Sequence, residues 1–147
     1  MCWLTEACLN WSRVHNLTAF KTPSSLINGH IIDSLSLKAN IDKLPHKQRW
    51  LDFGTGPGFP GLVLAIIRPD HHFVLLDSHS KKLAFVRHAK ATLELDNVEV
   101  VHQRIEDYQP TEGFDIITAR AVVTIETVIH LTHHLLEPNG HFWLLKG

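Results

Sequence analysis

LDFGTGPGFPG, residues 51–61, is the stretch of sequence that decides the fold. An apolar segment ends at Asp52, glycines follow at positions 54, 56, 58 and 61, and Pro60 can begin a helix. Glycine adopts positive φ and lets a ligand approach the backbone where any Cβ would collide, and a helix start presents free amide groups. The segment therefore predicts a strand, a loop that closes on a ligand, and a helix.

The remainder of the chain alternates apolar segments with helical patterns. We predict strands in RWLDFG, HFVLLD, NVEVVH, FDIITAR and HFWLLKG, with helices over about residues 60–67, 80–95 and 122–136 and a turn at 137–140. Short, continuously apolar strands separated by helices are typical of a parallel sheet covered on both faces. The expected fold class is therefore α/β, with a Rossmann-like parallel sheet of five strands.

Two predicted helices form an N-terminal arm, residues 1–45, before the α/β core of residues 48–147. The first covers residues 3–16. The second begins with Thr22 as the N-cap and Pro23 in the first turn, and one side of it carries Leu26, Ile27, His30, Ile31, Ser34 and Leu35. A chain of 147 residues, 44% of them hydrophobic, is expected to fold as one domain.

Charge and residue usage exclude several classes of protein. Fourteen basic and fifteen acidic side chains give a net charge of −1, which argues against a binder held to nucleic acid by bulk charge. Cys2 and Cys8 form no CxxC pair, so we expect a reducing cytoplasm and no metal site. The longest aliphatic run, residues 62–67, is too short for a membrane span. We interpret His130, His133 and His134 as surface residues.

The spacing of the glycines favours one of two adenosyl cofactors. Asp77 closes the second predicted strand, where a carboxylate can accept hydrogen bonds from two ribose hydroxyls of an adenosyl cofactor. In a dinucleotide site the first glycine would be Gly54, and the third would fall at position 59, which is Phe59. Asp52-x-Gly54-x-Gly56-x-Gly58 is instead typical of S-adenosylmethionine sites. An NAD(P) oxidoreductase domain stays open as the less favoured alternative.

Several motifs in consistent order resemble the GidB/RsmG family of bacterial methyltransferases: NLT (16–18), HIIDSL (30–35), LDFGTGPGFPG (51–61), LLDS (75–78), TAR (118–120) and LLKG (144–147). The resemblance implies a class I methyltransferase fold with strand order 3-2-1-4-5. It also implies a cytoplasmic, monomeric enzyme that transfers a methyl group from S-adenosylmethionine to N7 of a guanine in 16S ribosomal RNA of the small subunit.

The same resemblance implies the cofactor-binding residues. Gly54 and Phe59 would contact the methionine and adenosine portions; Gly56, Gly58 and Asp77 are expected beside them from the spacing described above. Ile105 and Glu106, after the third strand, would line the adenine pocket, and Arg120 would complete the set. Arg120 is also expected from its position, because ligands of open α/β sheets bind at the carboxyl ends of the strands.

Catalytic candidates are His30, Asp33, Arg120 and Lys146. His30 and Asp33 lie three residues apart on one helix, although Gly29 stands where the family commonly has a basic residue. Guanine N7 carries no proton, so the reaction needs alignment rather than a general base. A cationic path for RNA is expected in the first 50 residues, which carry Arg13, Lys21, Lys38, Lys43, Lys47 and Arg49.

The length of the chain leaves a second functional alternative open. Family members begin earlier and continue past LLKG, so we expect a chain shortened at its C-terminus, with HFWLL as an exposed edge strand. Such a chain would be either an enzyme or a non-catalytic domain that binds S-adenosylmethionine or ribosomal RNA.

Overall fold

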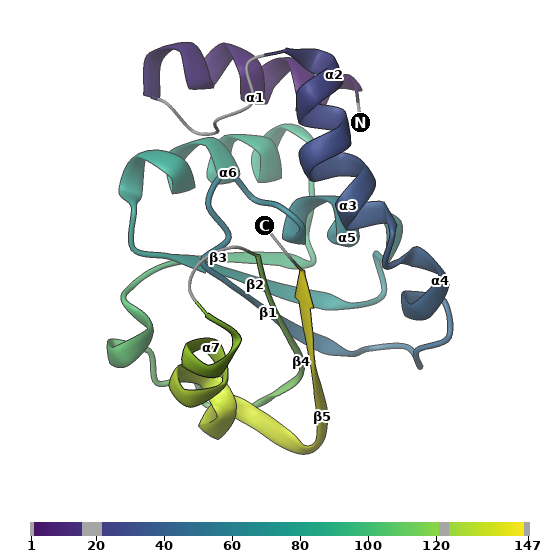
Figure 1. Ribbon diagram of the computed structural model, residues 1–147, viewed down its shortest axis with the longest axis vertical. Helices are drawn as coiled ribbons and strands as arrows, with labels where there is room; N and C mark the ends of the chain where they lie inside the picture. The colour runs from purple at the N-terminus through teal and green to yellow at the C-terminus, as the bar shows by residue number, and fades with distance from the viewer. Residues whose placement is uncertain (1, 16–21, 121–123, 146–147) are drawn as a thin grey trace.

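A parallel sheet forms the centre of the protein in this computed structural model, which describes residues 2–15, 22–120 and 124–145 (Figure 1). Its strands pair in the order β3-β2-β1-β4-β5. They are β1 Arg49–Phe53, β2 His72–Asp77, β3 Val98–His102, β4 Phe114–Arg120 and β5 Leu136–Leu145. All four pairings are parallel. The five predicted strands and the expected strand order are confirmed.

Helices cover both faces of the sheet, so β1 and β2 are buried along most of their length. On one face lie α5, Gly61–Ile67, and α6, Ser80–Thr92. On the other face lie α7, Ile125–Thr132, and the 3-10 turns η2, Ile105–Asp107, and η3, His133–Leu135. Because helices bury the strands on both faces of the sheet, the strand sequences are continuously apolar and do not alternate between apolar and polar residues.

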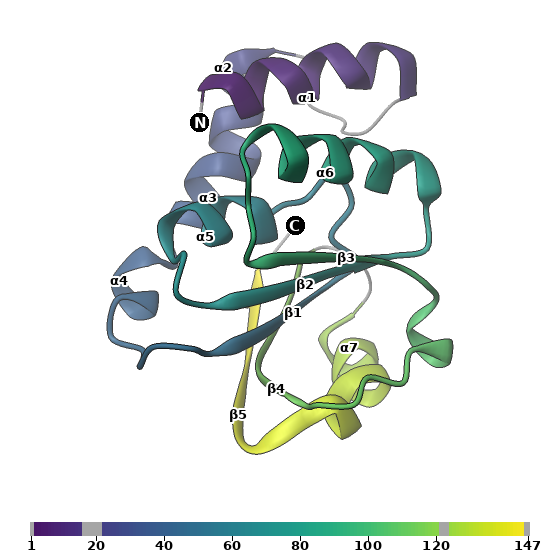
Figure 2. The ribbon, with the colours of Figure 1, turned by 180° about the vertical axis from the view of Figure 1, so that it is seen from behind.

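The arm packs over α5 and α6. Helix α1, Cys2–His15, runs antiparallel to α6 (Figure 2), and the ring of Trp11 lies edge-on to Phe85 and stacks on His88. The second predicted helix forms as α2 Pro23–Leu26, η1 Ile27–Ile31 and α3 Ile32–Leu35, followed by α4 Lys38–Ile41. Its predicted start is confirmed, because the Thr22 side chain accepts a hydrogen bond from the Ser25 amide in a capping box.

A π-helical turn, η1, changes which side of the second arm helix is buried. The Ile32 amide donates to the Ile27 carbonyl, five residues back. In a regular α-helix, Leu26 and Ile31 would point about 140° apart. The wider turn brings both into the core, with Leu26 fully buried and Ile31 5% exposed. Ile27, expected on the buried side, is 39% exposed instead.

The connection from α7 to β5 differs from the sequence-based prediction. The helix expected over 122–136 ends at Thr132, and η3 completes the connection. The turn expected at 137–140 is an irregularity within β5: Phe114 pairs with Leu136, but Ile116 already pairs with His141. Gly140 permits this close passage, since a Cβ there would lie 2.9 Å from the carbonyl oxygen of Asp115. The sequence signals a chain reversal at this point, but strand pairing continues on both sides of it.

A buried imidazole joins the arm to the sheet. Trp50 Nε1 donates to His71 Nδ1 over 2.9 Å, so the His71 proton lies on Nε2, which donates to the Pro45 carbonyl over 2.9 Å. Burial lowers the pKa of His71 below its ordinary value of 6.5, and only the neutral ring can accept from Trp50 while donating to Pro45. The link between arm and core therefore depends on an uncharged histidine.

We predict that His71→Leu lowers the free energy of unfolding at pH 8 by about 1–3 kcal/mol, because the buried Trp50 N–H loses its acceptor. A lowered folded-state pKa stabilises the protein above pH 6.5, and this contribution is lost as the pH falls further. Urea unfolding between pH 8 and 5 should therefore show the two proteins converging. His130→Gln, at an exposed position, should stay parallel to the parent, and a constant gap for His71→Leu would contradict the prediction.

Candidate functional site

The carboxyl ends of β1, β2 and β4 bring the polar residues of the site together. In the strand register, Asp52 lies between Leu75 of β2 and Thr118 of β4. Asp77 ends β2 and Arg120 ends β4, each two residues beyond the partner of Asp52. The side chains of alternate residues point to one face of a strand. Asp52, Asp77, Thr118 and Arg120 therefore share one face at one edge of the sheet.

The glycine loop turns back onto β2 as soon as β1 ends. The amides of Gly54 and Thr55 both donate to the Leu76 carbonyl, at 2.9 and 3.0 Å. Gly54, Gly56 and Gly58 have φ of +68°, +58° and +101°, a region that residues with a Cβ rarely adopt. The amides of Gly58 and Phe59 then donate to the Thr55 carbonyl and lead into α5.

Gly56 marks an unfilled space at this edge. Its backbone is buried, yet a Cβ added there would meet no atom of the described residues within 4 Å. At Gly61, by contrast, a Cβ would lie 2.7 Å from Asp52 Oδ2 and 2.8 Å from Leu75. Gly61 is therefore needed for packing inside the protein, whereas Gly56 leaves room for a ligand to approach the backbone.

Asp52 is a carboxyl group buried beneath the loop, with only 1% of its surface exposed. Its Oδ2 accepts hydrogen bonds from Thr55 Oγ1 over 2.7 Å and from the Gly61 amide over 2.9 Å. Burial raises the pKa of Asp52 to about 7; the negative charge of Asp77 adds to this rise, and the two hydrogen bonds and the charge of Arg120 oppose it. The charge of the site near neutral pH therefore depends on the protonation of Asp52.

Asp77 is held in its ionised form. Its Oδ1 accepts from the amide and from Nδ1 of His79, at 2.9 and 2.7 Å, and its Oδ2 accepts from the Gly56 amide at 2.8 Å. Burial alone would raise the pKa of Asp77, but these hydrogen bonds outweigh it and lower the pKa. The N-cap of α6 is His79, so Asp77 serves the glycine loop rather than the helix.

Thr118 and Arg120 complete the polar cluster. The Thr118 hydroxyl is fully buried beside Asp52 and has no hydrogen-bond partner among the described residues. The positive charge of Arg120 acts on Asp52, as expected for a guanidinium at the carboxyl end of β4. Sequence reasoning missed Thr118 and His79; the available signals were a threonine inside an apolar strand and a histidine two residues after Asp77.

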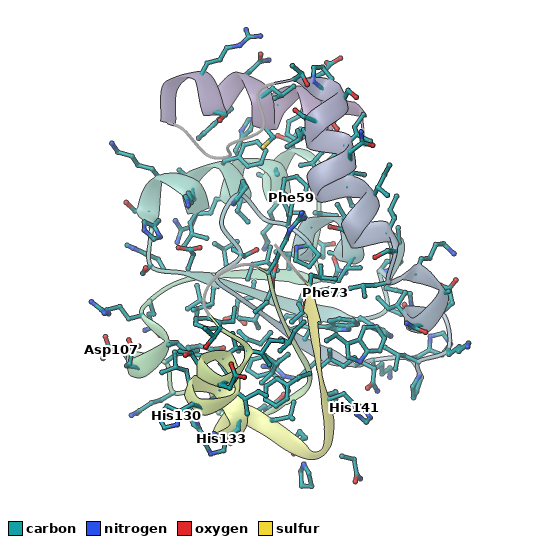
Figure 3. All side chains as sticks on the ribbon, viewed as in Figure 1. Phe59, Phe73, Asp107, His130, His133 and His141 are labelled. Atoms are coloured by element: carbon teal, nitrogen blue, oxygen red, sulfur yellow. The ribbon has the colours of Figure 1, made fainter. Side chains whose placement is uncertain are left out.

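Other predicted site residues lie differently. The Phe59 side chain is 3% exposed and packs in the core beneath the arm (Figure 3). Ile105 is buried in the core on the opposite face, and Glu106 is exposed beside Arg104, at 3.4 Å. Any ligand contact from Phe59 or Ile105 would therefore come from the backbone.

The remaining catalytic candidates are only partly described. The backbones of His30 and Asp33 lie in η1 and α3, but their side chains lie outside the described part of the structure. Lys146, Lys21 and the NLT segment, 16–18, also lie outside the described residues.

The histidine cluster lies on α7 and η3, on the opposite face of the sheet from Phe59 (Figure 3). His133 Nδ1 lies 3.1 and 3.2 Å from the backbone carbonyls of Ile129 and His130. Within residues 2–15, 22–120 and 124–145, no three His, Cys, Asp or Glu side chains gather as a metal site, and no helix is long and apolar enough to cross a membrane.

Comparison with known proteins places the chain in a family. The profile of the GidB family, described as rRNA small subunit methyltransferase G, matches residues 2–147. The chain belongs to the GidB family. The ribosomal RNA small subunit methyltransferase G of Aeromonas salmonicida is 43% identical over 144 residues, which cover 98% of this chain and 67% of the relative. That of Hydrogenovibrio crunogenus is 45% identical over 137 residues, covering 93% and 62%.

The GidB chain spans about two thirds of the length of these curated relatives. Its fold is that of class I methyltransferases. A SAM-dependent methyltransferase from Geobacter sulfurreducens, solved in complex with S-adenosyl-L-homocysteine, superposes with a TM-score of 0.64 at 19% identity, covering 77% of this chain and 47% of that one. The implied fold family is therefore confirmed.

We predict that Asp52→Asn changes how stability depends on pH. A carboxyl whose pKa rises on folding stabilises the folded state at low pH, and this contribution is lost as the pH rises from about 4 to about 7. Asparagine keeps acceptor capacity for Thr55 and Gly61 but does not ionise. The free energy of unfolding of the variant, relative to that of the parent, should therefore rise with pH by up to about 4 kcal/mol across this range.

Urea unfolding from pH 4.5 to 8 measures this difference. Asp42→Asn, at an exposed carboxylate paired with Lys38, serves as the control and should leave the pH dependence close to that of the parent. A gap between Asp52→Asn and the parent that is constant with pH would show that Asp52 does not titrate in this range.

Proposed function

We propose that this GidB chain transfers the methyl group of S-adenosylmethionine to N7 of a guanine in 16S ribosomal RNA of the small subunit. The observation that carries the proposal is the unfilled space at Gly56, next to the ionised Asp77, at the sheet edge where ligands of this fold class bind. Family membership and the names of the relatives support ribosomal RNA as the methyl acceptor.

The polar groups of the site fit the cofactor. A carboxylate offers about four acceptor positions, and the donors from His79 and Gly56 fill three of them on Asp77. The position left on Oδ2 can accept a ribose hydroxyl, one rather than the two that the sequence suggested. The absence of a Cβ at Gly56 lets the adenosyl group approach the loop.

The protein's part in the reaction is to position the two reactants and to balance charge. S-adenosylmethionine, when bound, supplies a methyl group on a positively charged sulfur. Transfer to guanine N7 would form the N7–methyl bond as the sulfur–methyl bond breaks, leaving S-adenosylhomocysteine, and because N7 carries no proton no residue has to act as a base. Correct placement of two reactants contributes about 7–11 kcal/mol to such a reaction. Asp77, Asp52 when ionised, and Arg120 set the charge around the cofactor.

We predict that Gly56→Ala weakens cofactor binding at least 100-fold while the chain stays folded. Positive φ at an alanine costs about 1–2 kcal/mol, but the new Cβ meets no described protein atom and instead fills the space assigned to the ligand. Calorimetric titration with S-adenosylmethionine and S-adenosylhomocysteine should show a loss of affinity of at least 100-fold, with urea unfolding as the check on folding. Unchanged affinity would place the cofactor elsewhere.

Asp77→Ala should weaken both ligands by about 1–3 kcal/mol, roughly 5- to 150-fold, because a charge-assisted hydrogen bond to the ribose is lost. Glu112→Ala, an exposed carboxylate near the opposite edge of the sheet, is the matched control and should bind normally. Equal affinity of the two variants would remove Asp77 from the site.

The activity itself is tested by incubating the chain with methyl-labelled S-adenosylmethionine and either naked 16S RNA or small subunits. Label should appear in 7-methylguanosine after nuclease digestion. Label in another nucleoside would refute guanine N7 as the methylated atom but would still demonstrate RNA methyltransferase activity. Binding of S-adenosylmethionine without any label in RNA would favour a non-catalytic binding domain. Tight NADH binding without S-adenosylmethionine binding would refute S-adenosylmethionine as the cofactor.

A further inference from the structure

Helix α6 carries an unusual concentration of positive charge. Its thirteen residues include Lys81, Lys82, Arg87 and Lys90 and no acidic residue. The whole chain has fourteen basic and fifteen acidic side chains, so the rest of it has an acidic excess of five. We call Lys81, Lys82, Arg87 and Lys90 the α6 basic surface.

These four side chains make no polar contact with the described residues of the chain. Four other basic residues form ion pairs with neighbouring carboxylates: Lys38 with Asp42, Arg49 with Glu112, Arg68 with Asp70, and Arg104 with Glu106. No residue of the α6 basic surface makes an ion pair or a side-chain hydrogen bond within the part of the chain that the structure describes. Their charges are available to a partner.

The stability of α6 does not account for the first two lysines. Lys81 and Lys82 lie in the first turn, where the helix dipole favours anions and disfavours cations by about 0.3–1 kcal/mol each. No acidic residue compensates there, and the N-cap His79 makes no side-chain capping bond. Helix stability therefore disfavours lysine at both positions, and we infer that these two side chains serve binding rather than folding.

The α6 basic surface begins at the rim of the site. Helix α6 starts three residues after Asp77, and Lys82 lies on the same side of it as the buried Phe85 and Val86. Lys82 is itself only partly buried, because it lies in the first turn, at the carboxyl edge of the sheet. From Lys81 to Arg87, both exposed, the helix rises about 9 Å, and Lys90 lies half a turn round the helix from Lys81.

Small residues separate the exposed cations. Lys81, Ala84, Arg87 and Ala91 are all exposed and follow one another at the three-to-four spacing of a single helix side. The ring contacts of α1 reach His88, which lies about two turns after Lys81 on this same side of α6, so α1 borders the stripe. Lys81, Ala84 and Arg87 nevertheless stay exposed, so a phosphate group can approach the first two turns of α6.

We propose that the α6 basic surface binds the phosphate backbone of the RNA substrate and leads the nucleotides that flank the target base to the site. This inference rests on the proposed function. Negative phosphates complement the four unpaired cations. Glu94, Asp96 and Glu99 line a depression beside Arg87 and Lys90, so the carboxylates limit the path at that end and Lys81 and Lys82 contribute most.

Four of the basic residues expected from the sequence are placed less well for this role. Arg49 begins β1, so it lies at the amino edge of the sheet, opposite the site, and it already pairs with Glu112. Lys43 and Lys47 precede it in the same connection, and Lys38 pairs with Asp42. Lys43 and Lys47 are exposed and unpaired among the described residues, which makes them a matched control.

Three double charge reversals test the proposal, each changing the net charge by the same amount: Lys81→Glu with Lys82→Glu, Arg87→Glu with Lys90→Glu, and Lys43→Glu with Lys47→Glu. For the first pair we expect KM for RNA to rise at least tenfold, with unchanged affinity for S-adenosylmethionine. The dependence of log K for RNA on log salt should become shallower by roughly 1 to 2. The second pair should show a smaller effect and the control less than a twofold change.

Unfolding cannot imitate this result, because glutamate in the first turn of α6 is favoured by the helix dipole and should preserve stability. Equal KM values for the first pair and the control, with an active parent, would overturn the assignment and leave the proposed function intact. If the parent chain methylates no RNA, the proposed function fails separately. Fluorescence anisotropy with a labelled 16S RNA fragment then still tests whether the α6 basic surface binds RNA. Equal RNA affinities for the parent and the first pair would refute that role.

Discussion

The site depends on the return of the glycine loop to β2. Three successive amides, of Gly54, Thr55 and Gly56, donate to the last carbonyl before Asp77 and to the Asp77 carboxylate itself. The chain can make this turn only because three positions in it adopt positive φ. The same turn places the start of α5 at Asp52, so the burial of the Asp52 carboxyl and the open space at Gly56 have a common cause.

The pKa values of two carboxyl groups on neighbouring strands, Asp52 and Asp77, are shifted in opposite directions. Asp77 receives three donors and stays ionised, whereas Asp52 receives two and lies deeper, so its pKa rises. Arg120 partly offsets their charge. The site is therefore weakly anionic near neutral pH, which suits a cofactor with a positively charged sulfur and limits the repulsion between the two acids.

Much of the fold follows from local sequence signals, because apolar strand runs, the Thr22-Pro23 cap and the glycine loop each specify geometry within a few residues. The strand order came from family resemblance and was confirmed. Features that depend on long-range packing were not predictable. The pairing of β4 with β5 continues on both sides of the expected turn at Pro138, and the Phe59 side chain packs in the core instead of facing the site. The partner of Asp77 was missed for the same reason, since the direction of the His79 ring depends on the folded loop.

The π-helical turn in the arm has a consequence for length variation. Its extra residue is accommodated between Leu26 and Ile31, both of which stay in the core. A chain with one residue fewer in this turn would have the same two side chains four apart, the spacing at which a regular α-helix buries them together. This turn is therefore a place where the arm can lose one residue while Leu26 and Ile31 keep their packing against the core.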